Sequence, residues 1–126
     1  MSRGLGDVYK RQIKGHASVV ALLLADERVD PKIADQKDET ALIAAAYKGH
    51  ASVVTLLLAD KRVDPNIADE DSFTALMIAA LEGHASVVTL LLADERVDPN
   101  IANQKGITAL MGAALEGHAS VVSILD

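Results

Sequence analysis

The chain has 126 residues, half of them apolar, and its 12 basic and 18 acidic side chains give a formal net charge of −6. An acidic surface repels phosphate backbones, which argues against nucleic acid as a partner, and the absence of cysteine excludes disulfides and thiolate chemistry. The longest apolar stretches fall well short of the roughly 18 residues that a membrane span needs. No basic region leads into an apolar signal segment, so we expect a cytoplasmic or nuclear protein.

The first 12 residues are expected to lie outside the organised part of the chain. Residues 2–12 read as the conceptual translation of a sequencing adapter, and we interpret residues 1–12 as an assembly scar and the chain as a fragment. The alternative is a divergent N-terminal capping helix. Without this leader, residues 13–126 carry 9 basic and 17 acidic side chains, a net charge of −8. Recovery of the same codons from the source locus by a different library chemistry would exclude the scar.

From residue 13 onward the chain repeats itself every 34 residues. Each repeat contains the motifs Gly-His-Ala-Ser-Val-Val and Leu-Leu-Leu-Ala-Asp, and the last copy of the second motif is incomplete. The four histidines are therefore equally spaced. Self-similarity of this kind predicts units that bury their apolar faces by stacking on their neighbours. We divide the array into a partial repeat at 13–34, full repeats at 35–68 and 69–102, and a partial repeat at 103–126.

Each full unit is predicted to contain two short helices, a tight turn and a long polar loop. In the unit 35–68, a first helix is expected to begin at the N-cap Thr40 and to be closed by Gly49 in a left-handed conformation. A second helix is expected from residue 50 or 51 to Ala59, because its valines and leucines recur at helical spacing. Pro65 cannot continue a helix and falls in the polar loop.

The pattern Asp-x-x-x-x-Thr-Ala-Leu-x-x-Ala-Ala-x-x-Gly-His-x-x-Val-Val-x-Leu-Leu-Leu resembles the ankyrin repeat. It is complete at 35–58 and 69–92, and a further copy opens with Asn103. The resemblance extends over everything from residue 13 and implies an all-α, ankyrin-like solenoid of stacked helix-turn-helix repeats joined by long hairpin-like loops. Tetratricopeptide repeats share the period, but their signature relies on core aromatic residues that this chain lacks.

Three departures from the ankyrin pattern are expected to lower stability without changing the fold. Thr-Ala-Leu replaces the usual Thr-Pro-Leu-His, so a proline suited to the first helical position and a bracing histidine are lost. The left-handed glycine of the turn is replaced by Asp38 and Ser72 and kept only as Gly106, and serine tolerates that conformation least well. One extra residue lies in the loop 60–63, where we expect a longer loop in place of a glycine cap.

The repeated histidines and serines are interpreted as structural residues, not as a metal or catalytic site. Stacked helices lie about 8–10 Å apart, whereas zinc ligands lie about 2 Å from the ion, so equivalent histidines cannot share one. No repeated acid completes a triad with the serine that follows each histidine. The Asp-Pro loops lack the dense acids of a calcium loop and are interpreted as solvated connectors. We predict no enzymatic activity, no cofactor and no metal.

The resemblance implies that the first helices and the projecting turns form a concave face that binds other proteins. The contact positions of the family follow the turn aspartate and end the first helix, and they are also the positions at which these near-identical units differ. Matched onto this sequence, the partner-binding residues are Gln36, Lys37, Glu39, Tyr47, Lys48, Glu70, Asp71, Phe73, Leu81, Glu82, Gln104, Lys105, Ile107, Leu115 and Glu116.

Stacking is expected to align the apolar members of this set into adjacent rows. Tyr47, Leu81 and Leu115 share one position in successive units, and Phe73 and Ile107 share another. An apolar surface bordered by charge usually marks an interaction site. The acids that border the rows are Glu39, Glu70, Asp71, Glu82 and Glu116. We therefore predict a protein partner with apolar anchors and basic flanks, and neither a nucleic acid nor a membrane as partner.

Other readings of the same surface stay open. The apolar residues can pack between repeats and bind nothing, and the array can be a purely structural spacer of a longer repeat protein. Uncapped ends of the array would expose helices to self-association. The resemblance also implies that Asn66 and Asn100 are candidate sites of asparaginyl hydroxylation, although their neighbours differ from the usual setting.

Overall fold

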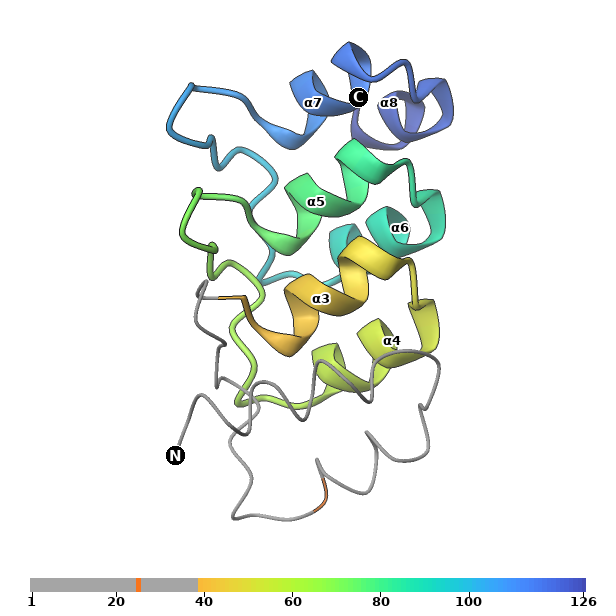
Figure 1. Ribbon diagram of the computed structural model, residues 1–126. Helices are drawn as coiled ribbons and strands as arrows, with labels where there is room; N and C mark the ends of the chain where they lie inside the picture. The colour runs from red at the N-terminus through yellow and green to blue at the C-terminus, as the bar shows by residue number, and fades with distance from the viewer. Residues whose placement is uncertain (1–24, 26–38) are drawn as a thin grey trace.

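The computed structural model describes Ala25 and residues 39–126, and in the latter range the chain forms six helices (Figure 1). Their bounds are α3 Ala41–Lys48, α4 Ala51–Ala59, α5 Ala75–Glu82, α6 Ala85–Ala93, α7 Ala109–Leu115 and α8 Ala119–Leu125. None of the described helices is long and apolar enough to cross a membrane. The predictions for the leader and for Gln36, Lys37 and Asp38 lie outside the described residues.

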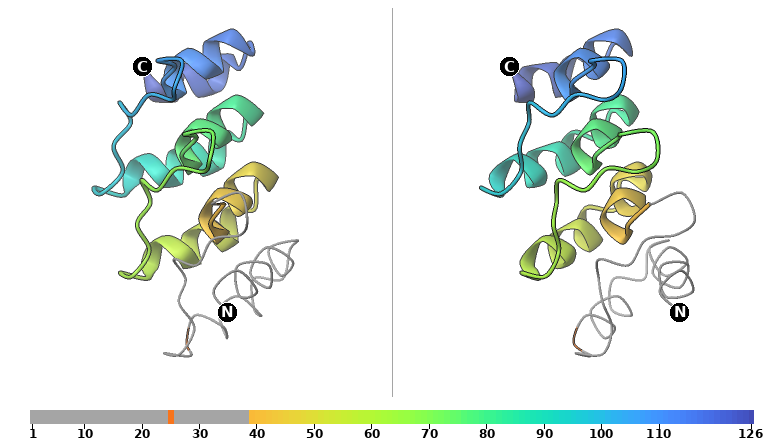
Figure 2. Two further views of the ribbon diagram at one scale, coloured as in Figure 1. Left: turned by 60° about the vertical axis from the view of Figure 1, so that its left-hand side comes forward. Right: turned by 90° about the vertical axis from the view of Figure 1, so that its left-hand side faces the viewer.

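The helices stack in two columns, as the views in Figures 1 and 2 show. One column holds α3, α5 and α7, each packed on the next, and the other holds α4, α6 and α8. The two helices of each repeat also pack on one another, and long loops lead from one repeat to the next. The prediction of an all-α solenoid of stacked helix-turn-helix units is confirmed.

The first helix of each repeat begins at the predicted threonine cap. The Oγ1 atoms of Thr40, Thr74 and Thr108 accept hydrogen bonds from the amides three residues later, at 3.2, 3.3 and 3.4 Å. This contact satisfies one of the free amides at a helix N-terminus. Gly49 and Gly83 close α3 and α5 with a φ of 76°. The predicted bounds of the first helix are therefore confirmed.

The second helix of each repeat supplies the centre of the core. Val53, Val54 and Leu57 of α4 are completely buried, as are the equivalent residues of α6. The helix α4 ends at Asp60, which has an extended backbone with φ −85° and ψ 118°. The helix thus ends without a glycine cap, as predicted.

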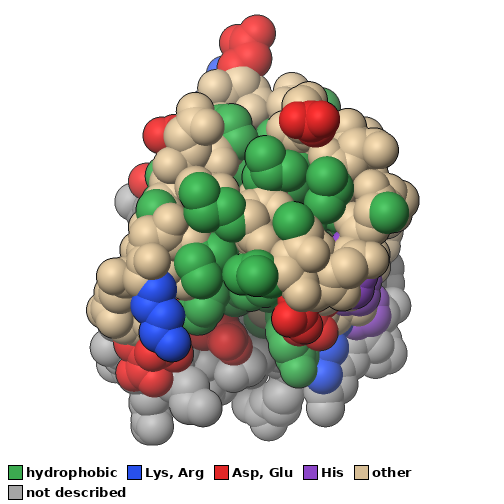
Figure 3. Space-filling view, turned by 90° about the horizontal axis from the view of Figure 1, so that it is seen from above, with side chains coloured by type: hydrophobic (Ala, Val, Ile, Leu, Met, Phe, Trp, Pro, Cys, Tyr) green, Lys and Arg blue, Asp and Glu red, His purple; other side chains and the backbone are tan. Residues whose placement is uncertain are grey.

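The helices α7 and α8 present a largely apolar end face in this structure, which Figure 3 shows from above. The side chain of Met111 is 51% exposed there, whereas its equivalents Met77 and Ile43 are 3% and 1% exposed. Among the second helices, α8 buries only Val121 completely. The same sequence positions that form the core between repeats are thus open at this end.

Candidate functional site

Two equivalent turns present Phe73 and Ile107 beside the column of first helices. In the first turn, Asp69 Oδ1 accepts hydrogen bonds from the amides of Asp71 and Phe73 at 2.9 and 3.0 Å. Asn103 Oδ1 accepts from the amides two and four residues further along at 2.9 and 3.0 Å. Because aspartate and asparagine both accept through this oxygen, the two turns have the same shape. We call the side formed by these turns and by α3, α5 and α7 the first-helix face.

One turn contains the predicted backbone strain. Ser72 has a φ of 67°, and it is the non-glycine residue in the described chain that adopts a positive φ. Gly106 occupies the equivalent position with a φ of 77°. A side chain in this left-handed region costs about 1–2 kcal/mol. This geometry agrees with the expectation that the turn at Ser72 is less stable than the turn at Gly106.

A cavity of about 370 Å³ opens on the first-helix face between the repeats 69–102 and 103–126. We call it the Gly112 cavity, after the helical residue at its floor. Its lining residues are Asp71, Phe73, Leu81, Asn103, Gln104, Lys105, Ile107, Gly112, Leu115 and Glu116. Eight of these ten were predicted as partner-binding residues from the sequence.

The other described members of the predicted set lie outside the lining of this cavity. Glu70 and Glu82 are exposed next to lining residues, while Glu39 belongs to the preceding repeat. Tyr47 is 49% exposed, and Lys48 Nζ lies 5.3 Å from the centre of its ring. The structure thus brings together the predicted residues of one repeat junction but does not unite the whole set in one cavity.

Two lining residues were missed by the sequence analysis. Asn103 was taken only as the opening residue of its turn. Gly112 occupies the position of Ala44 and Ile78 in the preceding repeats, and the loss of a side chain gives no chemical signal by itself. The available signal is that this position differs in all three units, as the predicted contact position of Glu39, Phe73 and Ile107 does.

The rim of the Gly112 cavity carries more negative than positive charge. Asp71 and Glu116 contribute carboxylates and Lys105 contributes an ammonium group. All three side chains are exposed. Within residues 39–126, the ion pairs are Asp60–Arg62 and Asp94–Arg96, and neither includes a rim residue. The rim carboxylates are therefore available to a basic ligand.

The repeated histidines connect neighbouring repeats. His84 Nε2 lies 2.9 Å from the carbonyl oxygen of Tyr47, and His118 Nε2 lies 2.8 Å from that of Leu81. Because a carbonyl oxygen only accepts, Nε2 must carry the proton in both contacts. Each histidine thus binds a carbonyl at the end of the preceding first helix, which agrees with the structural role implied by the resemblance. Within the described residues, no three potential metal ligands cluster.

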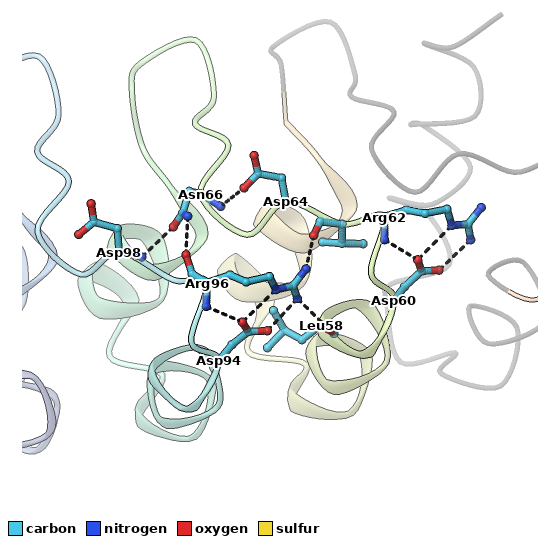
Figure 4. Close-up of polar contacts among 9 residues, drawn as sticks. Leu58, Asp60, Arg62, Asp64, Asn66, Asp94, Arg96 and Asp98 are labelled. Atoms are coloured by element: carbon cyan, nitrogen blue, oxygen red, sulfur yellow. Dashed lines mark hydrogen bonds and ion pairs between the residues drawn. The ribbon is translucent and has the colours of Figure 1, made fainter.

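The loops that follow α4 and α6 form a second connection between repeats (Figure 4). The guanidinium of Arg96 donates to Asp94 within its own loop, at 3.0 and 2.8 Å. It also donates to the carbonyl oxygens of Leu58 at 2.9 Å and Val63 at 2.6 Å in the preceding repeat. Hydrogen bonds from Arg96 hold the pKa of Asp94 below its ordinary value of 3.8.

Asn66 belongs to the same connection. Its Nδ2 donates to the carbonyl oxygen of Arg96 at 2.7 Å, and its Oδ1 accepts from the amide of Asp98 at 2.9 Å (Figure 4). The interpretation of these loops as solvated connectors was incomplete, because their side chains also join one repeat to the next. The sequence offered a signal for this connection, because the motif Asp-x-Arg-Val-Asp-Pro recurs at 60–65 and 94–99. The proposal that Asn66 and Asn100 are hydroxylated stays a prediction.

Comparison with known families agrees with this architecture. A family model described as ankyrin repeats, in three copies, matches residues 11–103 of the chain. No curated protein matches it. The matched range includes the repeats 35–68 and 69–102 and ends at Asn103, so the wall of the Gly112 cavity that residues 104–116 contribute lies beyond the match.

Proposed function

The chain belongs to the ankyrin-repeat family, whose members generally serve as protein–protein interaction modules, and we propose that it is a non-catalytic scaffold that binds a protein partner on its first-helix face. The resemblance inferred from the repeat pattern is confirmed by the family match. The proposal includes the array boundaries 13–126, with residues 1–12 outside the array. It also includes a location in the cytoplasm or nucleus.

The observation that carries this proposal is the composition of the Gly112 cavity. The two repeats agree at most core positions, and they differ at five of the seven repeat positions that line the cavity, among them Phe73/Ile107 and Ile78/Gly112. Variation concentrated on one surface changes what that surface can contact while most of the core residues stay the same. Phe73 and Ile107, held by equivalent turns, give this surface apolar side chains that a partner can cover.

Charge supports a basic partner. In the described part of the predicted set, the acids Glu39, Glu70, Asp71, Glu82 and Glu116 outnumber the bases Lys48 and Lys105. Complementary charge accelerates association and selects among partners more than it adds affinity. We therefore propose a protein segment with apolar anchors and basic flanks, and not a nucleic acid, as the ligand.

Selection from a random peptide library on the immobilised chain tests this function. We expect the selected peptides to combine one or more large apolar residues with lysine or arginine, and to lose about tenfold in affinity with the Tyr47→Ala/Phe73→Ala variant. Ser86→Ala, an exposed change on α6, is the matched control and is expected to bind as the parent does. Equal binding by both variants, with the helical content unchanged, would contradict a site on this face. Failure to select any peptide would favour the alternative of a structural spacer.

A further inference from the structure

We propose that the Gly112 cavity accepts one large apolar side chain, such as leucine, methionine or phenylalanine, from a segment whose neighbouring residues are lysine or arginine. This inference rests on the proposed function and deepens it, because it assigns the specificity of the face to one repeat junction. The cavity is 370 Å³ in volume, near the lower end of the range of about 300–1,000 Å³ that is usual for ligand pockets.

Gly112 lines the cavity and has no side chain to fill it. A Cβ atom added there would lie 3.0 Å from Leu81 Cδ2, 3.3 Å from Leu81 Cγ and 4.0 Å from Ile107 Cγ2. Leu81 and Ile107 both line the cavity. Any side chain at position 112 would therefore push Leu81 and occupy space between the walls.

At the preceding junction the equivalent position carries a side chain. Ile78 is the equivalent of Gly112, and it packs against the hydrophobic core. The residue that corresponds to Leu81 at that junction is Tyr47, which is 49% exposed, whereas Leu81 is only partly exposed. The junction with isoleucine in the helix thus has an exposed tyrosine, and the junction with glycine has a less exposed leucine.

The walls favour an apolar side chain. Phe73 and Leu81 come from one repeat, and Ile107 and Leu115 come from the next. Leu115 is 71% exposed, so covering it removes apolar surface from water. Such burial of a single anchor in a pocket commonly dominates binding by a peptide segment.

The rim selects what lies next to the anchor. Asp71 and Glu116 come from different repeats, so their carboxylates border the cavity from both sides of the junction. Lysine or arginine residues next to the anchor would pair with these acids, while acidic residues would be repelled. Lys105, also on the rim, leaves the net charge of the rim residues negative.

Binding of the peptides Gly-Lys-Arg-Gly-X-Gly-Arg-Lys-Gly, with X as alanine, leucine, phenylalanine or tryptophan, tests the inference by fluorescence polarisation. For the parent chain we expect leucine or phenylalanine at X to bind about tenfold more tightly than alanine. Gly112→Ile is expected to reduce this ratio to about one while leaving the weaker, charge-dependent binding of the alanine peptide in place. Leu81→Ala, which enlarges the cavity, is expected to shift the preference toward tryptophan.

Two further variants guard against misfolding and separate the possible outcomes. Gly112→Ala adds a single carbon to the floor and favours helix, so its urea midpoint is expected to be unchanged or higher and its leucine-to-alanine ratio lower. Met111→Ser, outside the cavity, is the control for the ratio. If Asp71→Asn and Glu116→Gln weaken every peptide but no change at 112 alters the ratio, the anchor pocket is wrong and the binding face stands. If no peptide binds, or none of these variants affects binding, both proposals fail.

Discussion

The imidazole of His84 lies against Gly49 of the preceding repeat, so closely that a Cβ on Gly49 would come within 2.8 Å of Nδ1. Gly49 also has a φ of 76°, as Gly117 does with a φ of 75°, but nothing lies within 4 Å of a Cβ on Gly117. The two glycines therefore share a backbone requirement and differ in their surroundings.

Gly117→Ala is expected to lower the free energy of unfolding by about 1 kcal/mol, because alanine in a left-handed conformation is strained. Gly49→Ala is expected to cost a further ~1–3 kcal/mol, because the added methyl group displaces His84 from its contact with the helix end. Urea unfolding of both variants measures the difference. Equal losses for the two variants would show that the histidine contact contributes nothing beyond backbone strain.

Relief of strain at Ser72 is expected to stabilise the fold. Ser72→Gly removes a side chain from a backbone with φ 67° and should raise the free energy of unfolding by about 1 kcal/mol. The reciprocal change Gly106→Ser, at the equivalent position with φ 77°, should lower it by a similar amount. Thermal unfolding followed by circular dichroism is sufficient, and shifts of the same sign in both variants would contradict the assignment.

The loop asparagines offer a matched pair for the connection between repeats. Asn66→Ala removes two hydrogen bonds to the next loop and is expected to cost about 1 kcal/mol, since exposed hydrogen bonds contribute modestly. The side chain of Asn100 makes no hydrogen bond to another described residue, so Asn100→Ala is expected to change stability by less than about 0.5 kcal/mol. A comparison of urea midpoints decides whether the side-chain contacts of Asn66 stabilise the stack.

Acid is expected to weaken the Asp94–Arg96 pair. Folding lowers the pKa of Asp94 below its ordinary value of 3.8, so the pair stabilises the fold above that pH and loses its contribution as the pH falls through the folded pKa. Between about pH 5 and pH 2.5, Asp94→Asn should therefore lose less stability than the parent, by less than about 1 kcal/mol because solvent screens this partly exposed pair. Glu95→Gln is the control for a change in net charge. A pH dependence of Asp94→Asn that matches the parent would contradict the prediction.

The end face predicts self-association. Met111→Lys replaces a side chain that is 51% exposed, so it is expected to change stability by less than about 0.5 kcal/mol and to reduce any dimer seen by sedimentation equilibrium. Met77→Lys, at the equivalent but 3% exposed position, should unfold the chain, because it buries an unpaired charge. Association that persists unchanged in Met111→Lys would exclude this face as the contact.

The fold could be predicted because its determinants are local and recur in every unit. The threonine cap before α3 and Gly49 at its end depend on the residues of one turn of chain, and each later repeat supplies the same signal again. The reach of Arg96 to Leu58 and Val63 could not be predicted in this way. It depends on how far apart the stacked loops lie, which no single unit encodes.

The candidate site was predictable as a set of positions but not as a shape. Repeat comparison placed Phe73, Leu81 and Ile107 on one face, and the structure gathers them around a cavity. The cavity itself depends on Gly112 and on the way Leu81 lies over it. Such mutual adjustment of neighbouring side chains is a property of packing and is not contained in the identity of either residue.

The side-chain contacts of His84 and Arg96 give the array a polarity. In both cases the donor belongs to the later repeat and the acceptor carbonyl to the earlier one. Unfolding that starts at the C-terminal end would therefore remove the side-chain donors from carbonyl oxygens of the preceding repeat, one repeat at a time. Loss of an earlier unit would instead remove the carbonyl acceptors of His84 and Arg96, so the two directions of disassembly expose different groups of these contacts.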